Sequence, residues 1–315
     1  MVDICLLGSG GGMPMPFRNL SSTLLSYKGR KILIDCGEGT QVSMKMIGWG
    51  FKTLDLICIT HCHGDHIVGL PGLLATLGNS GRTTKVTIIG PQGITKVIEG
   101  ISVLFPYLPY ELEVIENPAL IEFTIDNNGI KVTEGNGEIK LTTLELEHSA
   151  PCIGYSFYIK RNRKFIAQVA EENNVPKVLW GKLQKGENVF YEGKEYHSNM
   201  VLGAERRGIK ISLTTDTRPL PSIKEFIRDS DLFICEGTYG DSLDIDKAIA
   251  NKHMTFKEAA ELAHCSKVYE LLLTHFSPAM LDPNEFINEA TTVFPNTIIG
   301  EDRLVKTLKF SEENI

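Results

Sequence analysis

The sequence lacks several features that would assign the chain to other classes of protein. It has no run of about 18 apolar residues, so no membrane-spanning helix is expected. Residues 1–7 carry no basic stretch ahead of a short apolar run, and they are expected to form a strand rather than a signal peptide. The seven cysteines are dispersed without a Cys-x-x-Cys pair. This argues against a disulfide framework and for the reducing cytoplasm.

Two further absences concern ligands. The glycine-rich stretch at residues 8–12 is not followed by Gly-Lys-Ser/Thr, so it is not a Walker A phosphate loop. The net charge of -7 argues against wholesale nucleic-acid binding. Residues 160–194 nevertheless hold eight Lys/Arg against four Glu, a local surplus of four positive charges. Charge alone favours a solvated face for this segment.

The pattern of elements predicts one large α/β domain over residues 1–315. The length and the 42% hydrophobic content support a sizeable core. Apolar runs predict strands at 3–7, 22–27, 31–35, 55–60, 86–89, 153–159, 210–216, 232–235, 269–274 and 297–299. Residues 111–147 alternate polar and apolar, as in period-two strands. Helices are expected at 41–47, 66–77, 92–104, 221–229, 256–264 and 283–292. Residues 160–208 break this rhythm and are interpreted as an inserted arm.

The stretch from Thr60 to His66 is the strongest chemical signal. It reads Thr-His-Cys-His-Gly-Asp-His and directly follows the apolar run 56–59. If it is extended, His61, His63 and Asp65 share one face, and His66 reaches in from the next helix. Imidazoles and a carboxylate suit Zn²⁺, and also Mn²⁺ or Fe. Four donors in so short a segment crowd a single ion, so two adjacent metals are expected. A solvated histidine-rich turn is the alternative, which the preceding hydrophobic strand disfavours.

Other ligand-type residues stand at the carboxyl ends of predicted strands, where layered α/β proteins build their sites. They are Asp65, His148, Asp216, Glu236 and His275. The simplest assembly places one metal on His61, His63 and His148, and the other on Asp65, His66 and His275. Asp216 then bridges two ions about 3.5–4 Å apart that share a water-derived nucleophile.

Glu236 and His253 are not needed as ligands. An acid and an imidazole of this kind can form a hydrogen-bonded pair that donates a proton to a leaving oxygen. The alternative is that His253 is an ordinary loop histidine. Its position in the sequence does not distinguish between these two roles.

With these residues in place, the chain resembles the metallo-β-lactamase superfamily and, within it, the ribonuclease Z (tRNase Z) family. The stretch His61–His66 matches the superfamily motif. The family resemblance rests on further segments: residues 14–19, 175–186, 216–219, 236–238, 253–255 and 273–277. The chain departs from the family pattern in the first of these, where Pro16 replaces a lysine, and at Cys235, which replaces a histidine.

The resemblance implies a four-layer αββα sandwich with an inserted flexible arm at about 160–208. It implies two zinc ions per chain, catalytic roles for Asp65, Glu236 and His253, and a cytoplasmic homodimer whose arm clamps tRNA. Under this resemblance, the basic segment is expected to be an RNA-binding surface rather than a solvated face. The substrate contacts it implies are Arg18, Asn19, Arg161, Arg163, Lys164 and Lys182.

Three functions follow as hypotheses. The leading one is a zinc-dependent endoribonuclease that removes the 3′ trailer from precursor tRNA and leaves a 3′-hydroxyl. The second keeps the hydrolytic chemistry but acts on small or cyclic nucleotide diesters. The third is a catalytically silent RNA-binding homologue, which the complete ligand set disfavours.

Overall fold

The computed structural model describes residues 1–311. The chain divides into two compact units. Unit 1 comprises Met1–Ile159 and Ile209–Lys309, and unit 2 comprises Lys160–Gly208 with the described residues from Phe310 onward. In the described part of the chain, every helix is too short or too polar to cross a lipid bilayer.

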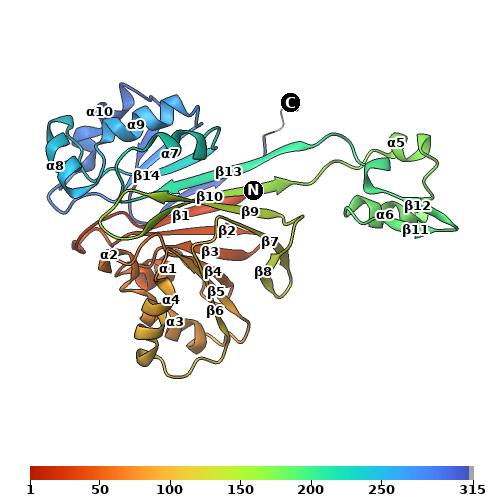
Figure 1. The fold of residues 1–315 in the computed structure, drawn as a ribbon, viewed down its shortest axis with the longest axis horizontal. Helices are drawn as coiled ribbons and strands as arrows, with labels where there is room; N and C mark the ends of the chain where they lie inside the picture. Colours follow the sequence, from red (N-terminus) through yellow and green to blue (C-terminus); the bar gives the residue numbers. More distant parts are fainter. Residues whose placement is uncertain (312–315) are drawn as a thin grey trace. The chain divides into compact units, whose positions relative to one another are not determined.

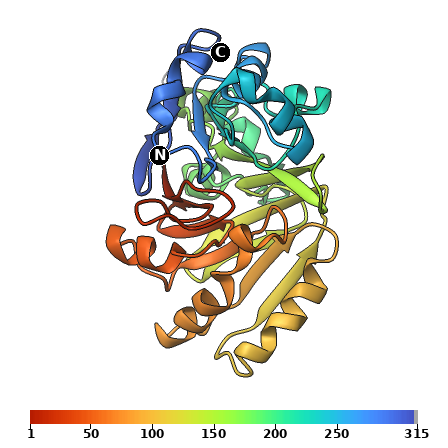
Figure 2. The same ribbon diagram turned by 90° about the vertical axis from the view of Figure 1, so that its left-hand side faces the viewer.

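Within residues 1–311, the first sheet of unit 1 has seven strands in the order β17-β1-β2-β3-β4-β5-β6. Strands β3 to β6 run parallel, whereas β17, β1, β2 and β3 pair antiparallel. The strands are β1 (Val2–Gly8), β2 (Ser22–Tyr27), β3 (Arg30–Ile34), β4 (Leu54–Cys58), β5 (Val86–Gly90), β6 (Leu112–Glu116) and β17 (Leu304–Leu308). The pairing of β17 with β1 brings both ends of unit 1 together (Figure 2).

The second sheet has eight strands in the same described range, in the order β16-β15-β14-β13-β10-β9-β7-β8. Its strands are β7 (Leu120–Asp126), β8 (Gly129–Thr133), β9 (Ile139–Leu146), β10 (Cys152–Arg161), β13 (Arg206–Thr214), β14 (Leu232–Glu236), β15 (Leu271–Thr274) and β16 (Thr297–Ile299). The two sheets face each other: Tyr155 of β10 donates its hydroxyl to the carbonyl of Ile59, directly after β4, at 2.6 Å.

Helices cover the outer face of each sheet of unit 1 (Figure 1). On the first sheet lie α1 (Thr40–Ile47), α2 (Gly64–Ile67), α3 (Leu70–Asn79) and α4 (Ile94–Ile101). On the second lie α7 (Pro221–Phe226), α8 (Ile245–Asn251), α9 (Phe256–Cys265) and α10 (Ile287–Thr291). Each helix layer shares a buried core with its own sheet, as Leu73 does with Ile57 and Phe256 does with Phe233. The expected αββα sandwich is therefore confirmed.

Four expected helices are shorter than the sequence suggested or are interrupted. The one expected at 221–229 ends at Phe226, as α7. The helix expected at 66–77 is interrupted between α2 and α3, because Gly69 packs against the 36–37 backbone: its amide donates to the Cys36 carbonyl, and a Cβ there would lie 2.3 Å from the Gly37 oxygen. The helix expected at 92–104 ends as the 3₁₀ turn Ser102–Leu104, and the one at 283–292 begins as the 3₁₀ turn Pro283–Phe286.

Unit 2 has a small core of its own. Its elements are α5 (Ala167–Glu172), α6 (Trp180–Gln184), β11 (Val189–Tyr191) and β12 (Lys194–Tyr196), with 3₁₀ turns at Lys177–Leu179 and Ser198–Met200. The buried residues of this core are Ala170, Val175, Leu179, Leu183, Tyr196, Val201 and Leu202. The segment is therefore a folded unit rather than an irregular loop.

Candidate metal centre and acid pair

The candidate site lies at the carboxyl ends of strands from both sheets. His61 and His63 follow β4, His148 follows β9, and Asp216 and His275 follow β13 and β15. Asp216 and His275 have left-handed backbones, with φ of 42° and 59°. A non-glycine residue in this conformation costs roughly 1–2 kcal/mol, so the surrounding structure must hold these turns in place.

The first group of donors joins His61, His63, His148 and Asp216, whose ligand atoms all lie within 4.8 Å of one another. His63 Nδ1 lies 3.1 Å from His61 Nε2 and 3.1 Å from His148 Nε2. Asp216 Oδ2 lies 3.4 Å from His61 Nε2. Residues far apart in the sequence thus converge on one point.

The second group joins Asp65, His66, Asp216 and His275. The two imidazoles meet at 3.1 Å between their Nε2 atoms, and Asp216 Oδ1 lies 3.1 Å from His275 Nε2. Asp65 belongs to this group because α2 begins at Gly64 and turns its side chain away from the face of His61 and His63. The expected extended conformation over 61–65 is therefore wrong at its last two residues. Asp216 is the one member common to both groups.

The ionisation of these side chains suits cation binding. Burial lowers the pKa of His61 to about 2, which leaves a neutral imidazole. Burial by itself would raise the pKa of Asp216, but the charges of His275 and His66 lower it well below its usual range. Hydrogen bonds from His275 and His66 likewise outweigh burial and lower the pKa of Asp65. Burial by itself would lower the pKa of His66, but the charges of Asp216 and Asp35 and their hydrogen bonds raise it well above its usual range. The buried carboxylates are therefore ionised, as ligands of a cation must be.

In each donor group, ring nitrogens of neighbouring imidazoles face one another at about 3.1 Å. A cation bound between them would accept the lone pairs of these nitrogens. Nitrogen and carboxylate donors in this number and arrangement fit divalent zinc-type ions. The two groups thus form a binding site for divalent metal.

Asp35 orients this site and was not among the residues selected from the sequence. Its Oδ2 lies 2.8 Å from His66 Nδ1 and accepts the Thr60 hydroxyl at 2.8 Å. Such outer partners fix the tautomer and direction of a ligating histidine. Asp35 follows β3 just as Asp216 follows β13, and it too is left-handed, with φ of 57°. The strand-end pattern could therefore have identified it.

The glycine-rich loop after β1 closes one side of the site. The Gly12 amide donates to Asp65 Oδ2 at 2.7 Å. A Cβ on Gly11 would lie 2.3 Å from His275 Cε1, so only glycine fits against that ring. The sequence indicated a close approach by this loop but not which residue it approaches.

The acid pair forms beside the second group. Glu236 is fully buried at the end of β14, and both its oxygens lie 3.1 Å from His253 Nδ1. The Thr238 hydroxyl, at 2.6 Å, donates to Glu236 Oε2 and lies 3.1 Å from His275 Nδ1. Burial alone would lower the pKa of His253, but the charge of Glu236 and its hydrogen bond raise it to about 9. A protonated imidazole is thus poised next to the metal site.

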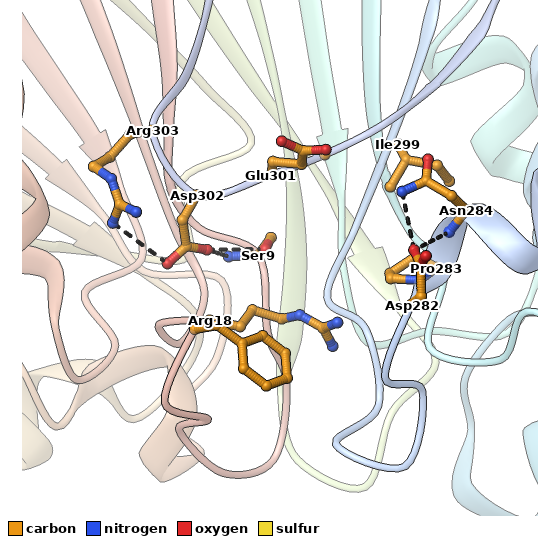
Figure 3. Close-up of a pocket in the computed structure, with 11 residues that line it drawn as sticks. Ser9, Arg18, Asp282, Pro283, Asn284, Ile299, Glu301, Asp302 and Arg303 are labelled. Carbon is orange, nitrogen blue, oxygen red and sulfur yellow. Dashed lines mark hydrogen bonds and ion pairs between the residues drawn. The ribbon is translucent and has the colours of Figure 1, made fainter.

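Arg18 lies at a cavity of about 260 Å³ lined also by Ser9, Asp302 and Arg303 (Figure 3). Arg18 is 6% exposed, and its guanidinium donates to the carbonyls of Met280 and Leu281 at 3.0 and 3.2 Å. These contacts pin the loop that follows His275. Asn19 donates its side-chain amide to Ser43 at 2.9 Å. Both side chains thus have partners within the protein, and their predicted contacts with substrate stay predictions.

The predicted contacts in unit 2 divide into two kinds. Lys164 and Lys182 are exposed. Arg163 instead donates to the Gly203 carbonyl at 2.6 Å, and Arg161 donates to the Ser311 carbonyl. The lysines are therefore the freer candidates for binding an anionic partner.

We predict that Gly11→Ala will lower metal affinity about 10–100-fold, the loss typical of disturbed ligand orientation. The added methyl group must displace the His275 ring. Metal content after dialysis and chelator titration measure the effect. Gly100→Ala is the matched control, since its Cβ meets nothing within 4 Å and lies in α4. Equal metal affinity in both variants would contradict the role given to Gly11.

Comparisons with known proteins identify the family of the chain. The family model described as Anti-Pycsar protein Apyc1 matches residues 2–169. Ribonuclease Z of Clostridium botulinum (strain Eklund 17B / Type B) is 57% identical over 313 residues, covering 98% of this chain and 99% of that protein. Ribonuclease Z of Clostridium tetani (strain Massachusetts / E88) is 58% identical over 311 residues, with coverage of 98% and 99%.

The crystal structure of human tRNase Z, short form, superimposes with a TM-score of 0.66 at 23% identity and covers 98% of this chain and 99% of that one. That likeness concerns the fold alone. The sequence relatives extend over nearly the whole chain at more than half identity. The chain therefore belongs to the ribonuclease Z family.

Proposed function

We propose that the chain is a zinc-dependent endoribonuclease that removes the 3′ trailer from precursor tRNA and leaves a 3′-hydroxyl. The observation that carries this proposal is the acid pair Glu236–His253, standing beside two donor groups that share Asp216. A hydrolase of RNA diesters needs both an activated water and a proton for the alkoxide that leaves. The full-length relatives named ribonuclease Z support the choice of RNA over a small or cyclic nucleotide.

We propose two zinc ions per chain, one on each donor group. Bound ions supply Lewis acidity to the phosphoryl group and lower the pKa of a water ligand to about 7. The ligating residues are His61, His63 and His148 in one group, Asp65, His66 and His275 in the other, and Asp216 in both. Elemental analysis of the purified protein measures the identity of the bound metal and the number of ions per chain, and we expect two zinc ions.

Side chains of the protein supply the proton transfers. Asp65, fixed by the Gly12 amide at 2.7 Å, accepts the proton of the attacking water as the new P–O bond forms. The bond from phosphorus to the 3′ oxygen breaks, and His253 donates its proton to that oxygen. Glu236 holds the imidazolium through Nδ1, so Nε2 is the donor. The phosphate stays on the trailer.

Incubation with a precursor tRNA that carries a 3′ trailer tests the proposal directly. We expect a single cut that yields a tRNA with a 3′-hydroxyl, and we expect a chelator to abolish it. Mapping both product ends locates the cut. Turnover of bis(p-nitrophenyl) phosphate with no cleavage of precursor tRNA would refute the tRNA assignment and favour the small-diester alternative.

We propose that unit 2 binds tRNA phosphates through its exposed lysines. Lys164→Ala with Lys182→Ala should weaken tRNA binding and lower the slope of log affinity against log salt by about 1 per lost phosphate contact. Binding titrations over a range of salt concentrations measure both. Lys224→Ala, an exposed lysine of unit 1, is the matched control. An unchanged slope in the double variant would contradict the role of unit 2.

We propose that the chain acts as a homodimer in the cytoplasm. Val42 and Met46 are exposed at 60% and 63% and share one face of α1, an apolar surface suited to a second copy. All seven cysteines carry free thiols, which suits a reducing compartment. Sedimentation equilibrium should give twice the 34.9 kDa chain mass, and Val42→Glu with Met46→Glu should halve it. A monomeric wild-type protein would refute the dimer.

A further inference from the structure

The turn that follows β13 carries more than Asp216. Glu147, next to His148, donates its amide to the Thr217 hydroxyl at 3.0 Å, and the Arg218 amide donates to the Glu147 carbonyl at 3.4 Å. The Thr217 amide donates to Glu236 Oε1 at 2.6 Å. The turn is thus hydrogen-bonded to the ends of β9 and β14. The side chain of Arg218 connects the turn to a further part of the site.

The Arg218 guanidinium joins two other parts of the site. Its Nη1 donates to the backbone carbonyl of His253, and Nη1 and Nη2 together hold the two carboxylate oxygens of Glu258. The Arg218 and Glu258 side chains are only 15% and 16% exposed. A bidentate, largely buried pair of this kind is geometrically specific.

Glu258 is itself anchored to a helix. It occupies the third position of α9, where its carboxylate accepts the Thr255 amide at 3.0 Å and its own amide donates to the Thr255 hydroxyl at 3.3 Å. This reciprocal capping box ties the carboxylate to the start of α9. The helix buries Phe256, Ala259 and Ala260 against the second sheet, so the anchor is rigid.

His253 depends on such an anchor, because it lies in a loop. Lys252 before it is left-handed, with φ of 57°, and the His253 amide donates to the Ala248 carbonyl at 2.8 Å. The imidazole is 15% exposed and faces Glu236 through Nδ1. Holding the carbonyl of this residue therefore fixes the direction in which its ring projects.

We propose that Arg218 and Glu258 are positioning residues that hold His253 where it can protonate the leaving oxygen. The pair connects the start of α9, the proton donor and the turn that carries Asp216, and so sets the acid at a fixed place relative to the metal ligands. This inference rests on the proposed function, in which His253 is the general acid.

The test compares substrates that differ in their need for a proton. The 3′ oxygen of RNA is a poor leaving group unless it is protonated, whereas p-nitrophenolate is a good leaving group without a proton. In Arg218→Ala we expect kcat on precursor tRNA to fall about 100-fold, the lower end of a general acid's contribution, with KM unchanged. Turnover of bis(p-nitrophenyl) phosphate and the metal content should stay as in the wild type. Arg218→Lys should recover little, because an ammonium cannot make the bidentate contact.

Two further variants sharpen the result. Adding Arg218→Ala to His253→Ala should cause no further loss on precursor tRNA, because residues that act through one group are non-additive. Arg228→Ala is the matched control. Arg228 lies just after α7 and forms an exposed ion pair with Glu225 of α7, at 2.6 Å, which holds no part of the site. Its kinetics should equal those of the wild type.

Three outcomes would overturn the inference. An equal loss on both substrates means that the pair only stabilises the fold. A rise in KM at constant kcat means that Arg218 contacts RNA itself. Full additivity with His253→Ala means that the two residues act separately. If the wild type does not cut precursor tRNA, the proposed function fails, and a crystal structure of Arg218→Ala decides the positioning role. His253 Nδ1 should then move from its 3.1 Å contact with Glu236, and an unmoved ring refutes it.

Discussion

The site is organised by the sharing of one buried carboxylate among several imidazoles. Asp216 lies 3.1–3.7 Å from His275, His61, His66 and His148, which come from three separate segments of the chain. A carboxylate taken out of water is costly unless positive charge and hydrogen bonds surround it. The fold meets this cost by bringing strand ends of both sheets to one place, so the metal site depends on the packing of the two sheets.

The backbone at the site shows a second constraint. Asp35, Asp216 and His275 all follow strands, and all three have left-handed φ values. This conformation turns the chain sharply, so that a side chain just past a strand points back over the edge of the sheet. Glycine would adopt it at lower cost but has no donor atom. The strain is thus accepted where a functional side chain must leave the sheet abruptly, as is common at active sites.

Much of the fold and both donor groups could be predicted, because each depends on short-range pattern. Apolar runs marked the strands, and ligand-type residues at their ends marked the donors His61, His148 and Asp216. The capping box of Thr255 and Glu258, which starts α9, is a local signal of the same kind, a threonine followed three residues later by a glutamate. What pattern could not supply were contacts between distant backbones: the break at Gly69, the Gly11 contact with His275, and the carbonyl partners of Arg18. Nothing local distinguishes an arginine that binds carbonyls inside the protein from one that binds RNA.

The closure of β1 by β17 has a consequence for the order of folding. Asp302, just before β17, accepts the amides of Ser9 and Asn19 at 2.9 and 2.7 Å, and so holds both ends of the loop that carries Gly11 and Gly12. Those contacts span sequence separations of 293 and 283 residues. Such non-local pairings form late, because a long loop must close first. A chain emerging from the ribosome therefore makes its histidine motif early but fixes the loop of Gly11 and Gly12 beside the second donor group only once Asp302 has been synthesised.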